Sequence, residues 1–509
     1  MRITNKIIQN NSLNNINTNK QLEDTLSTML SSNKKIARPS DDPIIALRSL
    51  RLRTSVNQVT QYVEKNVEDA KSWLTVTEKA IDTLSEIIAD VRKQYVKGTS
   101  DTLKPEDRTI ITDNLEALAA EIYNTGNADF AGRNVFAGYR TDTTITFQKQ
   151  EDAEYVILEN EKTVTMDSIS YVNYVDNDAD GTIIENEVAV TEITRIRLSY
   201  DKIDSVIPAV TDGAGKPVAP AKYDEYNNIV PSASVMVNGV AVNPTIISTS
   251  ATPNPYKVVA DDPTAAVLIP ETGELLLGSG IAATPEDIKN CSVVYQRTKW
   301  EKGDLRPEHY FDCKDNTNNK TYTSHGGEIE YNIGVNQSLR INTTADECFS
   351  HNIVRDLQDV IESIKDVNDA KARVTKIKAD LAALPENSDD AAVVAEKDRL
   401  NTALDAANKA LTFINDKMHK LFSKSITKAD KYLDRNNVAL TDCGTRSKRL
   451  ELIENRLDTQ LGSLKELKSE NEDADLAETA IQMKSAEYSY NASLMATSKI
   501  LQETLLNYI

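Results

Sequence analysis

The sequence predicts an α+β protein: long N- and C-terminal helices packed as a coiled-coil bundle, a β-rich inserted outer domain, and a helical hairpin. Two observations carry this prediction. Apolar residues recur every three or four positions in residues 1–126 and again from about 352 onward, as on one face of a helix. Between about 127 and 349, short alternating and β-branched runs are separated by Gly, Pro, Asn and Asp clusters, which is typical of strands and turns.

A polar segment marks the start of the clearest helix. Proline is favourable at the first helical position, because its missing N–H would have no partner there anyway. An aspartate just before it can accept hydrogen bonds from the first free amides, and a second adds negative charge at the positive end of the helix dipole. The sequence therefore predicts a helix start at RPSDDP, which comprises Arg38, Pro39, Ser40, Asp41, Asp42 and Pro43.

A 3.5-residue period follows this start. Spacings of four and three residues alternate through Val63, Val67, Ala70, Leu74, Thr77, Ile81, Leu84, Ile88, Val91 and Tyr95. Such a period predicts a helix packed along one seam of a coiled coil, running from Pro43 to Lys97 and ending at Gly98. A second helix is expected from Pro105 to Asn124, closed by Gly126.

The C-terminal part is expected to be helical as well. LPENSDD at 384–390 predicts the turn of a helical hairpin that spans 365–425. Further stripes run through Leu450, Ile453, Leu457, Leu461, Leu464 and Leu467, and then through Leu476, Ala480, Met483, Tyr490, Leu494, Leu501, Leu505 and Tyr508. Because each helix has one apolar stripe, we expect helices from the two ends to pack on each other.

The middle of the chain contains the runs expected to form strands: TTITF, YVIL, KTVTM, TRIRLSY and SVMVNGVAV. The resulting division has three parts. Terminal assembly helices occupy 1–40 plus 470–509, a helical rod domain occupies 41–147 plus 350–469, and a β-rich outer insert of one or two subdomains occupies 148–349.

Composition excludes several classes of function. The 509-residue chain is 40% hydrophobic and 27% charged, so it is expected to fold, and its formal charge of −20 argues against general binding to nucleic acid or an anionic membrane. No apolar run approaches the ~18 residues of a membrane span, and none has the form of a cleavable signal peptide. We therefore expect either the cytoplasm or an export route that reads no Sec-type signal.

Evidence for catalysis is weak. The four cysteines form no CxxC pair and are expected to be free thiols. His309 and Cys313 could share a metal, but a loop packed under Trp300 and Tyr310 is the favoured interpretation. HExxH is absent, and TDGAGKP at 211–217 lacks P-loop spacing and is expected to be a turn. We therefore expect no enzymatic activity and no required cofactor.

One motif has the spacing of a calcium loop. Residues 176–187 read DNDADGTIIENE, which satisfies D-x-D-x-D-G-x₅-E. The flanking residues are expected to form strands rather than the helices of an EF-hand. An acidic, solvated hairpin loop is the equal alternative. The candidate ligands are the carboxylates of Asp176, Asp178, Asp180 and Glu187 and the backbone carbonyl of Thr182.

Several separated motifs, in the right order at both ends, resemble the flagellin superfamily. They are MRITNKIIQNNSLNNIN, RPSDDP, GRNVFAGY at 132–139 and the stretch from NRLDTQLGSLKELKSENEDADLAETAI to LLNYI. The resemblance covers roughly 1–147 and 426–509. It is closest to the hook-associated members, found where hook meets filament, because flagellins typically have a KDDAAG-type segment in place of RPSDDP and an LSLL-like tail.

The resemblance implies a structural protein, secreted through the flagellar channel without a cleaved signal and located in the extracellular flagellum. It implies a ring or tube of identical copies, with a hook-associated protein on one side, flagellin on the other and an export chaperone on the C-terminal helix before export. The assembly residues would be Ile3, Ile7, Leu494, Leu501, Leu505 and Tyr508. Filament flagellin and a calcium-dependent surface adhesin remain the alternatives.

Overall fold

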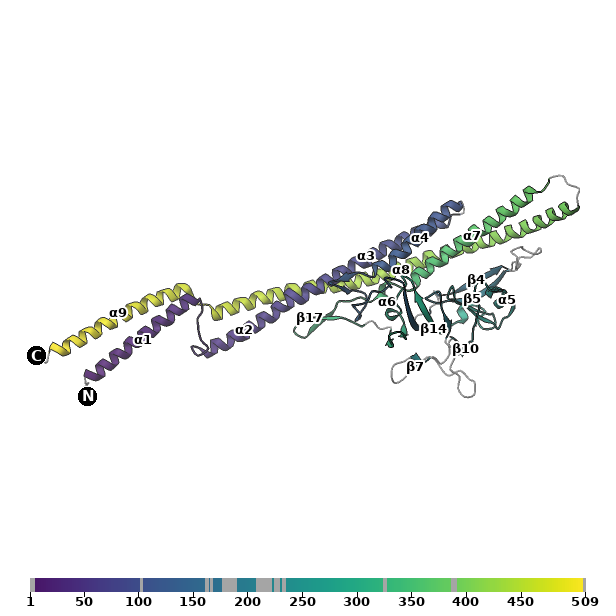
Figure 1. The fold of residues 1–509 in the computed structure, drawn as a ribbon. Coiled ribbons are helices and arrows are strands. Elements are labelled where there is room, and N and C mark those ends of the chain that lie inside the picture. The colour runs from purple at the N-terminus through teal and green to yellow at the C-terminus, as the bar shows by residue number, and fades with distance from the viewer. Residues whose placement is uncertain are drawn as a thin grey trace, which may run out of the picture. The chain divides into compact units, whose positions relative to one another are not determined.

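The computed structural model describes residues 5–100, 104–160, 164, 168–175, 190–206, 222–223, 229–230, 235–323, 327–385 and 391–506. As the sequence predicts, long helices form both ends and a β-rich region forms the middle (Figure 1). Contacts divide the chain into two compact units: Met1–Lys71 with Tyr331–Leu339 and Lys448–Ile509, and Ser72–Glu330 with Arg340–Ser447. The three-part division expected from the sequence stays a prediction. Among the helices that the structure describes, none is both long and apolar enough to cross a bilayer.

In the first unit, helices from opposite ends of the sequence pair. Helix α1 (Asn5–Ser32) lies beside α9 (Leu476–Leu506) (Figure 1). The side-chain amide of Asn19 donates to the Ser493 hydroxyl at 2.7 Å, and Leu26 and Ala486 are buried. The prediction that helices from the two ends pack on each other is therefore confirmed for this pair.

The helix that starts at RPSDDP contains a π-helical turn that the sequence analysis did not predict. Helix α2 (Pro43–Gln61) continues through η1 (Tyr62–Val67) into α3 (Glu68–Gly98). Val59, Val63 and Val67 follow at two successive spacings of four residues, which would rotate the stripe around an α-helix. The wider π turn lets Val59 and Val67 both be buried. The expected start and end of the helix are confirmed.

The second unit contains the helical bundle of the middle of the chain. Its helices are the main part of α3, α4 (Pro105–Thr125), α7 (Asn352–Ala383) and most of α8 (Ala391–Glu472). The predicted α3 stripe from Val67 to Tyr95 is buried throughout, and the ring of Tyr95 meets that of Phe422 at 6.2 Å. Helices α7 and α8 flank the predicted hairpin turn, of which residues 386–390 lie outside the described part.

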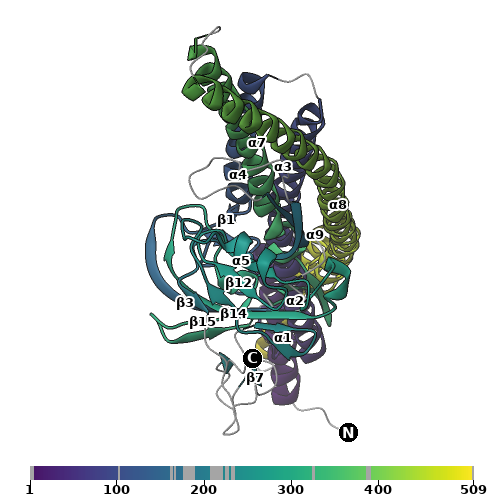
Figure 2. The same cartoon turned by 90° about the vertical axis from the view of Figure 1, so that its right-hand side faces the viewer.

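The larger sheet of the described residues has the order β10-β9-β14-β3-β15-β16, with β6 also paired to β14. Strands β3, β14 and β15 run side by side and antiparallel (Figure 2). Trp300 is fully buried in this region, stacked on Phe147 at 4.9 Å. The strands are β3 (Glu151–Glu159), β6 (Ser205–Val206), β9 (Val235–Val237), β10 (Val240–Ala241), β14 (Cys291–Trp300), β15 (Asp312–Asp315) and β16 (Lys320–Tyr322).

The second sheet has the order β11-β12-β13-β5-β4, antiparallel except for the β11–β12 pair. Helix α5 (Pro255–Asp261) covers it, and Val259 of this helix packs with Ile193, Val267, Ile269 and Leu276. The strands are β4 (Ile169–Val175), β5 (Val190–Arg197), β11 (Thr245–Ile246), β12 (Ala266–Ile269) and β13 (Glu274–Leu277).

The shorter described elements complete the fold. Three pairs form two-stranded sheets: β1 (Asp129–Phe130) with β2 (Arg133–Asn134), β7 (Lys222–Tyr223) with β8 (Ile229–Val230), and β17 (Glu330–Gly334) with β18 (Gln337–Arg340). Two 3₁₀ turns and a one-turn helix are η2 (Pro285–Asp287), η3 (Pro307–His309) and α6 (Ala345–Cys348).

Buried ion pairs fix the second sheet to α7 within the second unit. Arg197 of β5 is 2% exposed, and its two terminal nitrogens each lie 2.5 Å from a carboxylate, of Asp356 and of Asp359. Arg195 bridges Asp359 at 3.0 Å and Glu274 of β13 at 2.5 Å. Burial raises the pKa of Asp359, but the two arginines lower it by more, so it stays well below its usual range.

Most of the predicted strands are present. YVIL lies in β3, TRIR lies in β5, and SVMVNGVAV forms the β9–β10 hairpin around Asn238 and Gly239, both with positive φ. Only Val164 of KTVTM is described. TTITF was wrongly expected to be a strand: it makes one isolated bridge, Thr146 to Leu305. The Thr144 hydroxyl donates to the Thr146 carbonyl at 2.6 Å, a local bond that competes with a strand ladder.

Replacing Gly273 by Ala is expected to destabilise the protein more than replacing Gly239 by Ala. Both glycines have positive φ, which costs alanine roughly 1–2 kcal/mol at either position. A Cβ at 273 would lie 2.0 Å from the Tyr200 backbone oxygen, whereas at 239 it meets nothing within 4 Å. Overpacking should add about 1–3 kcal/mol at 273. Urea unfolding, followed by Trp300 fluorescence in a Trp73→Phe background, measures both; equal losses would contradict this account.

Candidate assembly surfaces

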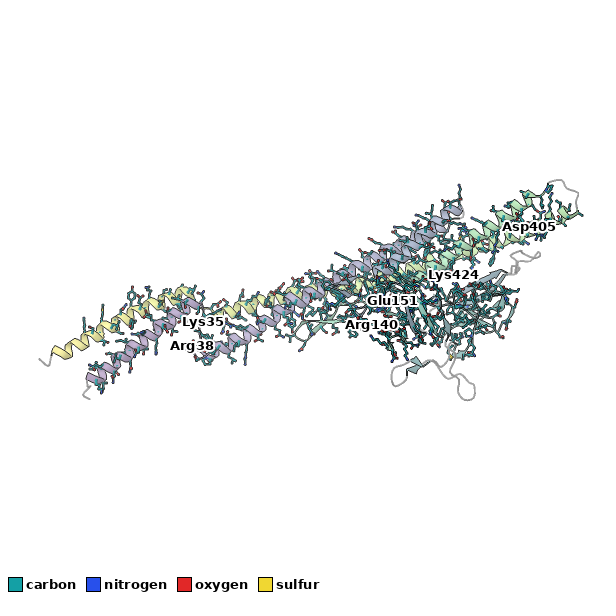
Figure 3. The ribbon with its side chains drawn as sticks, in the orientation of Figure 1. Lys35, Arg38, Arg140, Glu151, Asp405 and Lys424 are labelled. Atoms are coloured by element: carbon teal, nitrogen blue, oxygen red, sulfur yellow. The ribbon has the colours of Figure 1, made fainter. Side chains whose placement is uncertain are left out.

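A joint connects α1 to α2 and α8 to α9 in the first unit. It consists of residues 33–42 and 470–475, and backbone hydrogen bonds connect these two segments. The Lys35 amide donates to the Glu472 carbonyl at 2.8 Å, and the Ala474 amide donates to the Asn33 carbonyl at 3.1 Å. The Lys35 ammonium also donates to the Glu470 carbonyl, while the neighbouring Arg38 is exposed (Figure 3).

RPSDDP uses its two aspartates differently. The Asp42 carboxylate accepts from the Ile44 amide at 2.9 Å and the Ile45 amide at 3.1 Å, so it is the N-cap of α2. The Asp41 carboxylate faces backward and accepts from the Ala37 and Arg38 amides, at 3.1 and 2.7 Å. Asp41 thus stabilises the loop before the helix, and Asp42 caps the first turn of α2. Pro39 and Ser40 are exposed, and Pro43 is the first helical residue, as predicted.

Glu472 is the centre of the joint, and the sequence analysis did not single it out. Its side chain is 4% exposed. Arg53 binds both of its oxygens, at 2.6 and 2.8 Å, the Ser49 hydroxyl donates to it, and the Lys34 ammonium lies 3.4 Å away. These partners, the Arg53 hydrogen bonds first, lower the pKa of Glu472 to about 2 against the effect of burial. No sequence signal separates it from the acidic residues around it.

Pairing of α1 with α9 leaves apolar residues uncovered on both helices. On α9, Ile481, Tyr488 and Met495 recur every seven residues and are 71%, 72% and 71% exposed. Ile481 and Tyr488 line a shallow, open hollow together with Lys484 and the small side chains of Ala480, Ser485, Ser489 and Ala492. Helix α1 similarly exposes Ile7, Leu13 and Leu22. Each helix of the pair therefore has one apolar set toward its partner and another toward solvent.

The predicted assembly residues are only partly described. Ile7 is 49% exposed and Leu494 is 41% exposed. Leu501 and Leu505 belong to α9, but their side chains lie outside the described part, as do Ile3 and Tyr508 altogether. Three further residues of the predicted C-terminal stripes were wrongly expected to lie in a seam: Leu467 and Leu476 are 52% and 49% exposed, and Ala480 is exposed as well. They lie near the joint, where the helix direction changes after Glu472.

The other candidate sites differ in how far the structure describes them. Asp176, Asp178, Asp180, Thr182 and Glu187 all lie outside the described residues. Their neighbours are strands, as predicted, because β4 and β5 pair up to Val175 and Val190. Calcium binding stays a prediction.

His309 and Cys313 are both buried, as is expected for a packed loop. The His309 imidazole lies 3.2 Å from the Thr144 carbonyl, and burial lowers its pKa to about 3. The four cysteines are free, as expected, and the structure shows that all four are buried. Within the described ranges, no group of three or more His, Cys, Asp or Glu could hold a metal ion.

The chain resembles known proteins in sequence. Residues 3–141 match the family described as bacterial flagellin N-terminal helical region. The chain is 28% identical over 144 residues to flagellar hook-associated protein 3 of Salmonella typhimurium, covering 28% of this chain and 45% of that protein. It is 27% identical over 224 residues to Escherichia coli flagellin, covering 41% of this chain and 44% of that protein. The chain thus matches less than half the length of these relatives.

One solved structure aligns with much of the chain. It is described as a flagellar hook-associated protein of Vibrio parahaemolyticus, with a TM-score of 0.36, 12% identity, and coverage of 85% of this chain and all of that one. A TM-score this low does not establish a shared arrangement. The described residues show long paired helices from both ends of the chain, with apolar side chains exposed on both helices. Residues 3–141 thus resemble the N-terminal helical region of bacterial flagellins.

Lowering the pH from 4.5 to 2 is expected to loosen the joint. Because the folded pKa of Glu472 is below its usual value, its stabilising contribution is fully present above about pH 4.5 and is lost as pH falls toward 2. Glu472→Gln should loosen the joint by roughly 1.5–3 kcal/mol at neutral pH and remove this pH dependence. Hydrogen exchange of residues 33–53 measures both effects. Asp458→Asn, an exposed change in the same helix, is the control; equal exchange in the two variants would contradict the role of Glu472.

Proposed function

We propose that this protein is a structural component of the bacterial flagellum that joins hook to filament, and that it assembles with its own copies through its terminal helices. The observation that carries the proposal is the second apolar face of the α1–α9 pair. Ile481, Tyr488 and Met495 would gain about 1.5–3 kcal/mol each for large side chains fully buried against a neighbour. The similarity to a hook-associated protein supports this role.

The composition of α1 also supports assembly. The first twenty residues contain seven asparagines and no acidic residue, so the helix is weak by itself. Its order depends on α9 and, in the proposed assembly, on helices of neighbouring copies. Such a segment also suits a chain that passes unfolded through an export channel. We therefore also propose that the flagellar type III system exports the chain without a cleaved signal.

The proposed partners are a hook-associated protein on the hook side, flagellin on the filament side and an export chaperone on α9 before assembly. The proposed location is the extracellular flagellum, and the role is structural rather than enzymatic. Filament flagellin is the second candidate, because the match to Escherichia coli flagellin covers more of the chain than the match to the hook-associated protein. A surface adhesin is the candidate from another class.

Immunogold labelling of intact cells, with antibody against the β-rich region 235–323, separates these candidates. A narrow band where hook meets filament supports the junction role. Label along the whole filament would identify a flagellin, and label elsewhere on the cell would identify an adhesin.

Two acidic substitutions on the exposed face of α9 are expected to abolish assembly. In the variant Ile481→Asp/Tyr488→Asp, a charge replaces each apolar contact, so incorporation should fall at least ~100-fold, since every 1.4 kcal/mol is a factor of ten. Complementation of a deletion strain, scored by swimming and by the immunogold band, measures it. Val240→Asp, at an exposed apolar position of β10, is the matched control and should swim normally. Normal swimming of the α9 variant, with the chain stably produced, would contradict the proposal.

We also propose that the connection between β4 and β5 binds calcium. The support is its D-x-D-x-D-G-x₅-E sequence and the pairing of Val175 with Val190, which brings the two ends of the connection together. Titration calorimetry of the full chain should detect binding that Glu187→Gln weakens by at least ~tenfold, because the bidentate ligand is lost. Asp262→Asn, an exposed carboxylate elsewhere in the insert, is the control. The absence of heat at millimolar calcium would rule the site out.

A further inference from the structure

The outer face of α2 is apolar and basic. Ile44, Leu47 and Leu50 are 66%, 52% and 60% exposed, and the exposed arginines Arg48 and Arg51 lie among them. Helix α2 contains no acidic residue, and the structure shows no ion pair for Arg48 or Arg51 within the described part of the chain. This face therefore presents apolar surface and uncompensated positive charge together. The whole chain, by contrast, carries a formal charge of −20.

One side of the last turns of α8 carries the opposite charge, although Lys465 and Lys468 lie elsewhere in the same turns. Leu467 is 52% exposed, and the exposed Glu466 and Glu470 flank it. As far as the described residues go, neither glutamate side chain has a hydrogen bond or an ion pair. Their spacing of four residues places both on one side of the helix, and the spacing of three between Arg48 and Arg51 does the same on α2.

These two faces lie on opposite flanks of one helix pair. The inner face of α2 contacts the end of α8: the Ile45 carbonyl accepts from the Asn471 side-chain amide at 3.2 Å, and Ser49 contacts Glu472. Leu47 and Leu50 point away from this contact on α2, and on α8 Glu466 and Glu470 point away from the buried stripe that ends at Leu461. A chain cannot join its own two outer faces, so only a second copy can bring them together.

We infer that the α2 face of one copy, formed by Ile44, Leu47, Arg48, Leu50 and Arg51, docks on the α8 face of the next copy, formed by Glu466, Leu467 and Glu470. This inference rests on the proposed self-assembly and names the surfaces that carry it. Because the two surfaces differ, the contact is heterologous: repetition produces a ring or a helical array rather than a closed dimer. The charges set register and partner choice, and the leucines supply the apolar contact.

Cysteine cross-linking tests which faces meet. The four native thiols are buried, so exposed cysteines can be added without removing them. A mixture of full-length Leu47→Cys and Leu467→Cys chains under mild oxidation should form the mixed disulfide dimer. We expect at least ~tenfold more than a mixture of Val240→Cys with Leu467→Cys, which gives the yield of random collision. Equal yields would overturn the inference, and so would strong cross-linking of Leu47→Cys chains with one another, which indicates a symmetric dimer.

Charge reversal tests whether the arginines and glutamates pair. Adding Arg48→Glu/Arg51→Glu to the Leu47→Cys chain should lower the yield of the mixed dimer about tenfold, through loss of attraction and new repulsion. Adding Glu466→Lys/Glu470→Lys to the Leu467→Cys chain at the same time should restore it. If the yield of the mixed dimer falls on charge reversal and the second pair of substitutions does not restore it, the assigned pairing is wrong.

The failure of this inference can be told apart from failure of the proposed function. If Arg48→Glu/Arg51→Glu chains still produce the immunogold band at the junction and swim normally, the protein assembles at that site by other surfaces. That result would support the junction role and contradict the α2–α8 contact. If unmodified chains produce no band at the junction, the proposed function itself is contradicted.

Discussion

Burial of single apolar stripes is the constraint on which the structure depends. Leu74, Ile81 and Ile88 of α3 are at most 1% exposed, yet no helix next to α3 in sequence could cover them all. The partners come from α8, more than 300 residues away: the Cys443 thiol contacts the Leu74 carbonyl, and Arg92 binds Asp430 at 2.6 Å. Since all of these contacts are long-range, neither end of the chain can order its helices fully before the other is present.

In the second unit, the chain enters and leaves the β-rich region at one neck, between the end of α4 and the start of α7. The Tyr123 hydroxyl lies 3.1 Å from the carbonyls of both Ser350 and His351, which ties the end of α4 to the start of α7. The rings of Phe136 and Phe349 meet edge to face at 4.9 Å beside it. Farther out, the buried pairs of Arg195 and Arg197 with α7 hold the second sheet. Removal of one partner of such a pair would leave a buried charge uncompensated, so each pair constrains where the sheet can lie on α7. The neck and these pairs together fix the direction of the insert on the bundle.

Features that depend on interactions between residues close in sequence could be predicted, and features that depend on distant residues could not. Periodicity and capping are local, so the α3 stripe, the helix start at Pro43 and the turn at Asn238 were predicted correctly. The π turn at Tyr62–Val67 and the failure of TTITF to form a strand depend on local competition that residue patterns do not show. Glu472 is a different case: Lys34, Ser49 and Arg53 approach it from more than 400 residues away, and only the fold reveals that it is buried. The most informative site residue was therefore the one without a sequence signal.

Exposed apolar faces on several helices raise the question of why isolated copies would not aggregate. The exposed apolar residues are few for the length of the helices: five large side chains on α9, three on α1 and three on α2, spread along the helices rather than gathered in one patch. A single contact of this size is weak, and the chain's charge of −20 opposes close approach of copies at random. When one contact has formed in register, the others form within the same pair of molecules at a high effective concentration. In the proposed assembly, weak contacts at several points favour addition to an existing array over association of free chains, and the joint at Glu472 links the helices that carry these contacts.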